Sequence, residues 1–314
     1  MSDTRTKPTY KEVIDDAIKA LKKLEGHTFD VLSINKPVDI EYAQFLSKTI
    51  SKLSSITGNM IEENMANHLN QIGKYSEFGK WIRQDPGFPD NIYQNDFLEK
   101  TPGFEVKAWF PFATEITARF KGSYQHCGDD NTYVALIAWL PEFILHGRPK
   151  IIDVWVGPAS EVAKCRDNHY YKPPQYLVVE PQETGGRTAN LQQTNVEGYV
   201  IQTDKEEQAQ QLLEAIQEVK EWDEKIKSSY SPTPEIIEKV NELHSKYSYR
   251  LDTNFAKIDR IEHEDIAKFK KRVYDKIFHD KKISHWRKIS KNEATIKEYM
   301  DLWKDEAPEE PIVD

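Results

Sequence analysis

The chain has few cysteines, no long apolar run and no apolar leader, and each absence argues against one class of protein. Its 314 residues include two cysteines, Cys127 and Cys165, and neither belongs to a Cys-x-x-Cys pair. Two isolated cysteines supply no disulfide framework and no cysteine zinc site, and they favour a reducing cytoplasm. No apolar stretch approaches the roughly 20 residues of a membrane helix, and residues 1–10 lack the apolar core of a secretory signal. We therefore expect a cytoplasmic protein with no membrane partner.

Two common catalytic signatures are missing as well. No glycine-rich phosphate loop follows a strand-like segment, which argues against ATP use. The nine histidines contain no His-x-x-x-His pair with a glutamate at metalloprotease spacing. The chain does have enough apolar material to fold, because 38% of its residues are hydrophobic and 11% are aromatic. We therefore expect a folded protein that neither uses ATP nor acts as a metalloprotease of this type.

Hydrophobic periodicity changes twice along the chain and predicts an α/β fold. Helical spacing comes first, then strand-like runs, with helical spacing again after Thr203. A break at 231–234 interrupts the last part, and residues 146–149, His-Gly-Arg-Pro, read as a turn. The expected helices are 9–25, 42–53, 59–72 and 159–169, and the expected strands are 104–110, 133–139, 150–156 and 176–179. We expect a core over 1–202 with a central mixed sheet flanked by helices, a helical C-terminal region over 203–305, and an acidic tail over 306–314.

The strand at 104–110 carries the most informative pattern. Its sequence, Phe-Glu-Val-Lys-Ala-Trp-Phe, alternates apolar residues with Glu105, Lys107 and Trp109. Side chains two apart on a strand share a face, so Glu105 and Lys107 project together, about 7 Å apart along the strand. Pro89-Asp90 precedes Glu105 by fourteen intervening residues. A carboxylate and an ammonium side by side, with a second carboxylate upstream, suit metal-dependent attack on a phosphodiester.

The pattern Pro89-Asp90-x14-Glu105-Val106-Lys107 resembles the PD-(D/E)xK nuclease superfamily, and most of all its type II restriction endonucleases. The resemblance covers roughly 54–180 and includes the apolar alternation of the Glu-x-Lys strand and the next strand at 133–139. It implies the restriction-endonuclease-like fold. It also implies that Asp90, Glu105 and the Val106 carbonyl bind Mg²⁺ and that Lys107 orients the attacking water. The ordinary alternative is a half-buried strand on which Glu105 and Lys107 form a surface ion pair of little energetic value.

Two further acidic residues bear on the same site. Asp96 also lies upstream of the Glu-x-Lys strand, but no proline precedes it and it would leave a tighter hairpin, so we favour Asp90. On the predicted helix 59–72, Glu62 flanks an apolar stripe and could reach the sheet edge. Related nucleases often carry such a helix glutamate near the metal, and the resemblance therefore makes Glu62 a catalytic candidate. The alternative for Glu62 is an exposed helix glutamate.

DNA contacts are expected from three segments. Two basic residues follow the catalytic strand and could reach phosphates or guanine edges: Arg119 and Lys121. A polar loop after Gly185-Gly186 is rich in side chains that pair with base edges in the major groove: Arg187, Asn190, Gln192, Gln193 and Asn195. The third segment, 268–291, holds ten cations against Asp275 and Asp280, a local charge of +8 in a chain whose net charge is −9. Its Lys270, Lys271 and Arg272 could bind phosphates, although a solvated helix face is equally compatible with the pattern.

These expectations combine into one function. The chain is predicted to be a Mg²⁺-dependent type II restriction endonuclease, part of a restriction-modification system, that cuts both strands of DNA at a short site. A palindromic site would imply a homodimer, since the twofold symmetry of protein and sequence then match. A repair or recombination nuclease of the same superfamily is the nearest alternative. A non-catalytic DNA- or protein-binding module is the alternative from another class.

Overall fold

The computed structural model describes most of the chain. The described residues are 6–30, 32–84, 87–112, 131–170, 177–180, 200–201, 250–253, 261–305 and isolated positions from 210 to 242. Their contacts form two compact units, one from described residues of 6–162 and 263–305, the other from described residues of 163–262. In this described part of the chain, no helix combines the length and apolarity needed to cross a bilayer.

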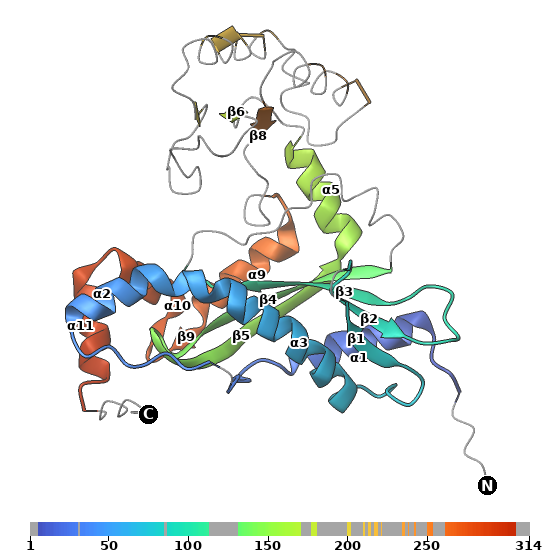
Figure 1. Ribbon diagram of the computed structural model, residues 1–314, viewed down its shortest axis with the longest axis horizontal. Coiled ribbons are helices and arrows are strands. Elements are labelled where there is room, and N and C mark those ends of the chain that lie inside the picture. Colours follow the sequence, from blue (N-terminus) through green and yellow to red (C-terminus); the bar gives the residue numbers. More distant parts are fainter. Residues whose placement is uncertain are drawn as a thin grey trace. The chain divides into compact units, whose positions relative to one another are not determined.

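The first unit contains a curled, mixed five-stranded sheet in the order β1-β2-β3-β4-β5 (Figure 1). Only β3 and β4 are parallel, and the other neighbours are antiparallel. The longest pairing joins β4 to β5 and contains two register shifts, after Ala138 and after Pro141. Such irregularities increase local twist and bend a sheet. The strands are β1 (Lys80–Arg83), β2 (Asn91–Gln94), β3 (Gly103–Trp109), β4 (Thr132–Phe143) and β5 (His146–Pro158).

Helices cover both faces of this sheet. On one face lies α3 (Ser54–Ile72), whose Gly58 faces the Ala108 side chain. Because Trp109 follows Ala108 on β3, it points to the opposite face. There it packs against Phe269 of α9 (Glu264–Asp275), with ring centroids 5.8 Å apart. The central strands are therefore buried on both sides, which explains why β4 reads as an almost continuous apolar run.

The C-terminal helices pack around the turn between β4 and β5. Ile144 and Leu145 form this turn and are fully buried in a cluster with Trp286, Ile296 and Tyr299. The elements here are α2 (Ile40–Thr49), η1 (Ile50–Leu53), β9 (Ile277–Phe278), β10 (Lys281–Lys282), α10 (Ile283–Trp286), η5 (Arg287–Ser290) and α11 (Glu293–Leu302). Residues 263–305 thus build the same core as the sheet.

Local sequence fixes several helix starts. Thr9 caps α1 (Tyr10–Lys22): the Glu12 N–H donates to Thr9 Oγ1 at 3.3 Å, and the Thr9 N–H donates to Glu12 Oε2 at 2.8 Å. Asp39 caps α2 by accepting from the Tyr42 N–H at 2.7 Å. Both are standard polar N-caps that satisfy helix N–H groups lacking a partner in the first turn.

The predicted α/β class is confirmed, and so are the main elements, but some details differ. The turn expected at 146–149 is wrong, because the chain reverses at Ile144-Leu145 and β5 already begins at His146. Gly147 does adopt a positive φ of 87°, so the glycine signal reflects a local kink inside β5. The region after 203 is not purely helical, since β8 (Arg250–Thr253) and the β9–β10 hairpin interrupt it.

The second unit contains a three-stranded sheet in the order β7-β6-β8. Strand β6 (Leu177–Glu180), expected from the sequence, pairs parallel with β7 (Val200–Ile201) and antiparallel with β8. Helix α5 (Ala159–Tyr170), also expected, connects β5 toward this unit along the chain.

Candidate active site

The candidate site lies where β2 and β3 separate. The ladder between these strands comprises only Asn91–Phe104 and Ile92–Gly103. Asp90 lies one residue before Asn91, outside the ladder. Its side-chain carboxylate, and not a backbone carbonyl of a neighbouring strand, bonds to β3 there. The Val106 N–H donates to Asp90 Oδ2 at 2.6 Å. Asp90 is therefore attached to the backbone of the Glu-x-Lys strand.

Pro89 brings Asp90 close to β3 because Gly103 leaves room for it. A Cβ atom at Gly103 would collide with the Pro89 ring, so a side chain there would push the two segments apart. Gln84, the residue just after β1, holds the same segment: its N–H donates to the Asp90 carbonyl at 2.7 Å, and its side chain donates to the Pro89 carbonyl at 2.9 Å. The position of Asp90 is thus determined by contacts on two sides.

Glu105 and Lys107 project from the same face of β3, as the alternation predicts. The Lys107 Nζ donates to Glu105 Oε1 at 2.6 Å. The same nitrogen lies 3.8 Å from Asp90 Oδ2. The structure therefore brings all three motif side chains together around one ammonium group.

Burial changes the pKa and the hydrogen bonding of the Glu105 carboxyl. Glu105 is only 9% exposed, and its Oε2 makes no hydrogen bond to any described residue. Burial raises the pKa of the Glu105 carboxyl, the Lys107 ammonium opposes this shift, and the Asp90 charge adds to it. Beside Asp90, the fully buried Asn91 also has an Oδ1 without a hydrogen bond in the described structure. Two buried oxygens therefore remain available to a ligand at the site.

Glu62 reaches the same site from α3. Gly58 allows α3 to lie close to Ala108, and Glu62 follows one helical turn later. The Glu62 carbonyl accepts from Asn91 Nδ2 at 3.4 Å, and its Oε2 lies 3.5 Å from Arg83 Nη2. Burial and the Asp90 charge raise the pKa of Glu62, while Lys107 and Arg83 oppose the shift. Glu62 thus lies close enough to Asp90 and Lys107 for their charges to act on it, contacts Arg83 directly, and is not a solvent-exposed helix glutamate.

The donors in this cluster suit a hard divalent cation in their chemistry. Such an ion takes oxygen ligands, and the site offers the carboxylates of Asp90, Glu105 and Glu62, including the unbonded Glu105 Oε2. As placed, however, no three His, Cys, Asp or Glu side chains of the described chain are gathered into a group that could hold a metal ion. Asp90 and Glu105 face Lys107, and Glu62 faces Arg83. The oxygens are present, but they are oriented toward cationic side chains.

The structure also separates the two rival aspartates. Asp96 lies outside the cluster, with a side chain 89% exposed and 3.8 Å from Lys7. Asp90 Oδ2 accepts from the Val106 N–H of β3 and lies 3.8 Å from Lys107 Nζ. Asp90 therefore lies near Lys107 and Asp96 does not, and a role for Asp90 in metal binding stays a prediction.

No family model, curated protein or solved structure matches the chain. The nuclease interpretation therefore depends on the motif residues and their arrangement. Seven of the predicted DNA contacts fall outside the described residues and stay predictions: Arg119, Lys121, Arg187, Asn190, Gln192, Gln193 and Asn195.

The other predicted DNA contacts lie on α9, where Arg272 has an acidic partner that the sequence did not predict. Arg272 donates twice to Asp153 of β5, from Nε to Oδ2 at 2.8 Å and from Nη2 to Oδ1 at 3.0 Å. Lys276 Nζ lies 3.2 Å from Asp153 Oδ2 and also pairs with the Glu25 carboxylate. A lone acidic residue inside the apolar run 151–156 was the available signal for a buried ion pair.

Internal ion pairs offset much of the basic segment's charge. Five of its ten cations lie within 4 Å of a carboxylate that belongs to the described residues: Lys268, Arg272, Lys276, Lys281 and Lys282. A contact of Lys270, Lys271 or Arg272 with phosphates stays a prediction. For Arg272, such a contact would have to coexist with the pair to Asp153.

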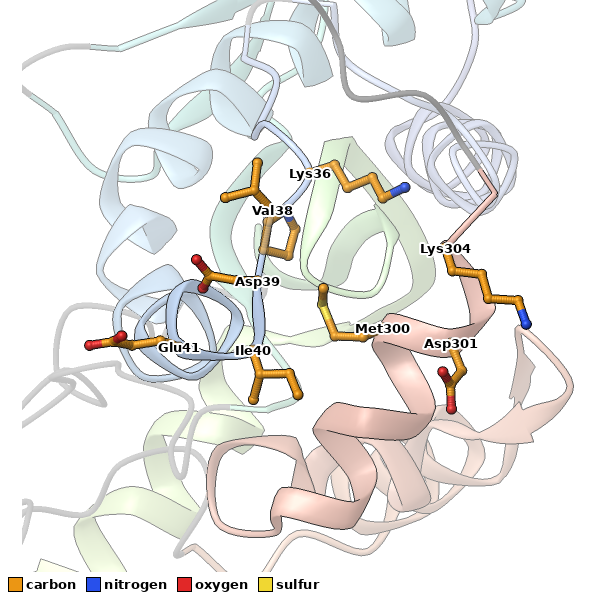
Figure 2. A pocket seen from close by; sticks show the side chains of 9 residues that line it. Lys36, Val38, Asp39, Ile40, Glu41, Met300, Asp301 and Lys304 are labelled. Carbon is orange, nitrogen blue, oxygen red and sulfur yellow. The ribbon is translucent and has the colours of Figure 1, made fainter.

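An open groove of about 850 Å³ is a separate feature that the sequence did not predict (Figure 2). It lies between the segment leading into α2 and the end of α11, and it is lined by Lys36, Pro37, Val38, Asp39, Ile40, Glu41, Met300, Asp301 and Lys304. Lys36 Nζ donates to the Trp303 carbonyl across this region. None of the candidate catalytic residues lines the groove.

Glu62→Gln is expected to stabilise the folded protein at neutral pH. The folded-state pKa of Glu62 is raised, so its ionised form is disfavoured by folding. The wild type therefore loses stability as the pH rises from the unfolded pKa, about 4.3, through the folded one. The variant has no such loss, and its advantage should shrink as the pH falls toward about 4.3. Thermal unfolding of both proteins at several pH values measures this difference.

Glu63→Gln is the matched control for this prediction. Glu63 is the next residue on α3 and also approaches Arg83, at 3.8 Å, but its side chain is 61% exposed. Its replacement should leave the unfolding temperature unchanged. A Glu62→Gln variant that is no more stable than the wild type at neutral pH would contradict the assigned burial cost.

Proposed function

We propose that the protein is a Mg²⁺-dependent endonuclease that hydrolyses both strands of double-stranded DNA at a short specific site, in the manner of a type II restriction enzyme. One observation carries the proposal: Asp90 and Glu105 converge on Lys107, with Asp90 hydrogen-bonded to the backbone of the same strand. A surface ion pair between Glu105 and Lys107 would not require a second, upstream carboxylate fixed to that backbone.

The residues of the cluster divide into two roles. Asp90 and Glu105, with the Val106 carbonyl, would hold Mg²⁺, and Glu62 would add a carboxylate from α3. When bound, the ion would polarise a phosphate oxygen and lower the pKa of a coordinated water. Lys107 would donate a hydrogen bond to the attacking water and offset negative charge that develops on the phosphate. Arg83, bound to Glu62 and Glu63, would fix the direction of the Glu62 carboxylate.

The proposed partners follow from this substrate. Double-stranded DNA would bind along surfaces that include α9, and a palindromic site would be read by a homodimer. A cytoplasmic location with a companion DNA methyltransferase would suit a restriction-modification system, because the host genome must be protected from cleavage.

Plasmid DNA incubated with the purified protein tests the proposal directly. With Mg²⁺ we expect discrete fragments, with no cleavage when EDTA is present. Sequencing the fragment ends should reveal one short common sequence. A smear would instead indicate a nuclease without site specificity. Intact plasmid with Mg²⁺, across several DNA substrates, would contradict the nuclease proposal.

A further inference from the structure

We propose that the Lys107 ammonium is an internal counterion that occupies the divalent cation's position in the metal-free protein. Metal binding would then be an exchange, in which the ammonium leaves the space between Asp90 and Glu105 as the ion enters. This inference rests on the proposed cation site, and it assigns Lys107 a regulatory role in addition to its proposed part in catalysis.

The distances support a shared position. Lys107 Nζ lies 2.6 Å from Glu105 Oε1 and 3.8 Å from Asp90 Oδ2. A divalent ion held by these carboxylates would have to lie about 2.0–2.6 Å from their oxygens. The ammonium nitrogen and such an ion therefore cannot occupy the cluster in this arrangement at once.

Burial explains why the cluster requires a counterion. Glu105 is 9% exposed, and the Lys107 ammonium lies near both its carboxylate and that of Asp90, the residue just before β2. Several carboxylates brought together away from water repel one another and lose hydration. A single ammonium that contacts two of them offsets this cost while no metal is bound.

The side chain of Lys107 can also leave. Lysine carries a compact charge on a flexible four-carbon stem, and the Lys107 side chain remains 22% exposed. A second cation in the cluster would repel the ammonium strongly at such short range.

Titration of the DNA-free protein with Ca²⁺ and Mg²⁺ tests this exchange. Lys107→Met keeps the length of the stem and removes the charge, so both ions should bind to it at least about 10-fold more tightly than to the wild type. Lys107→Arg keeps the charge and should bind the ions about as weakly as the wild type. Calorimetry measures the affinities. Without metal, Lys107→Met should unfold at a lower temperature than the wild type, and Ca²⁺ should raise its unfolding temperature more.

Lys297→Met is the control, because Lys297 forms an exposed pair with Glu293 on α11 and its loss should not alter metal affinity. If Lys107→Met fails to fold, Lys107→Gln is titrated in its place. Equal or weaker binding by the uncharged variants would overturn the exchange, even if wild-type plasmid cleavage upholds the proposed function. Absence of ion binding by every variant would also overturn it, and plasmid cleavage would then decide the proposed function separately.

Discussion

Asp90→Asn is expected to reduce the rate of DNA cleavage by at least about 100-fold while leaving the fold intact. Asparagine removes the negative charge that would hold the metal. Its amide oxygen can still accept the hydrogen bond that the Val106 N–H donates to Asp90 Oδ2 at 2.6 Å in the wild type, so the link between residue 90 and β3 should survive. Initial rates of plasmid cleavage with Mg²⁺ measure the loss, and thermal unfolding checks the fold.

Asp96→Asn is the matched control for this experiment. It makes the same chemical change six positions away, at an 89% exposed side chain that lies near Lys7. Its cleavage rate should equal that of the wild type. Full activity in Asp90→Asn, or an equal loss in Asp96→Asn, would remove Asp90 from the site.

Asp153→Ala is expected to lower the free energy of unfolding by about 2–4 kcal/mol. Asp153 is 4% exposed and accepts two hydrogen bonds from Arg272, with Lys276 also 3.2 Å away. Removing it leaves Arg272 of α9 and Lys276, the residue after α9, without their common partner on β5. The Arg272 side chain is 50% exposed, so water would recover part of the cost and keep the loss below that of a fully buried pair. Urea unfolding measures the change.

Glu293→Ala provides the comparison for the unfolding experiment. It removes the partner of Lys297 in an exposed i,i+4 pair on α11, and pairs of this kind contribute little to stability. Its unfolding curve should overlay that of the wild type. If the unfolding curve of Asp153→Ala also overlays that of the wild type, the Arg272–Asp153 pair does not stabilise the packing of α9 on the sheet. Arg272 could then bind DNA phosphates without a cost in stability.

The sheet strands were predictable because their signal is local. Alternation over 104–110 placed Glu105 and Lys107 on one face, and both side chains do meet there. The apolar runs at 133–139 and 150–156 lie inside β4 and β5. By contrast, β1 and β2 were not predicted. Each has only four residues, which is too short for periodicity to distinguish a strand from a loop.

The site itself needed contacts between distant parts of the chain. The preceding proline and the hairpin length favour Asp90 over Asp96, but nothing in the segment 89–96 shows that the Asp90 carboxylate will bond to the Val106 N–H. The choice follows from the register of β2 on β3 and from the room that Gly103 leaves for Pro89. The position of Glu62 likewise depends on how closely α3 approaches β3 at Gly58.

The sequence by itself determined the α/β class, the main helices and strands, and the shared face of Glu105 and Lys107. These features depend on residues a few positions apart, whose relation is set by helix and strand geometry. Only the tertiary structure decided which aspartate joins the cluster, that Lys107 lies between two carboxylates, and that Arg272 pairs with Asp153. These contacts join residues that are up to 119 positions apart, and packing and strand register, which short-range patterns do not contain, bring them together.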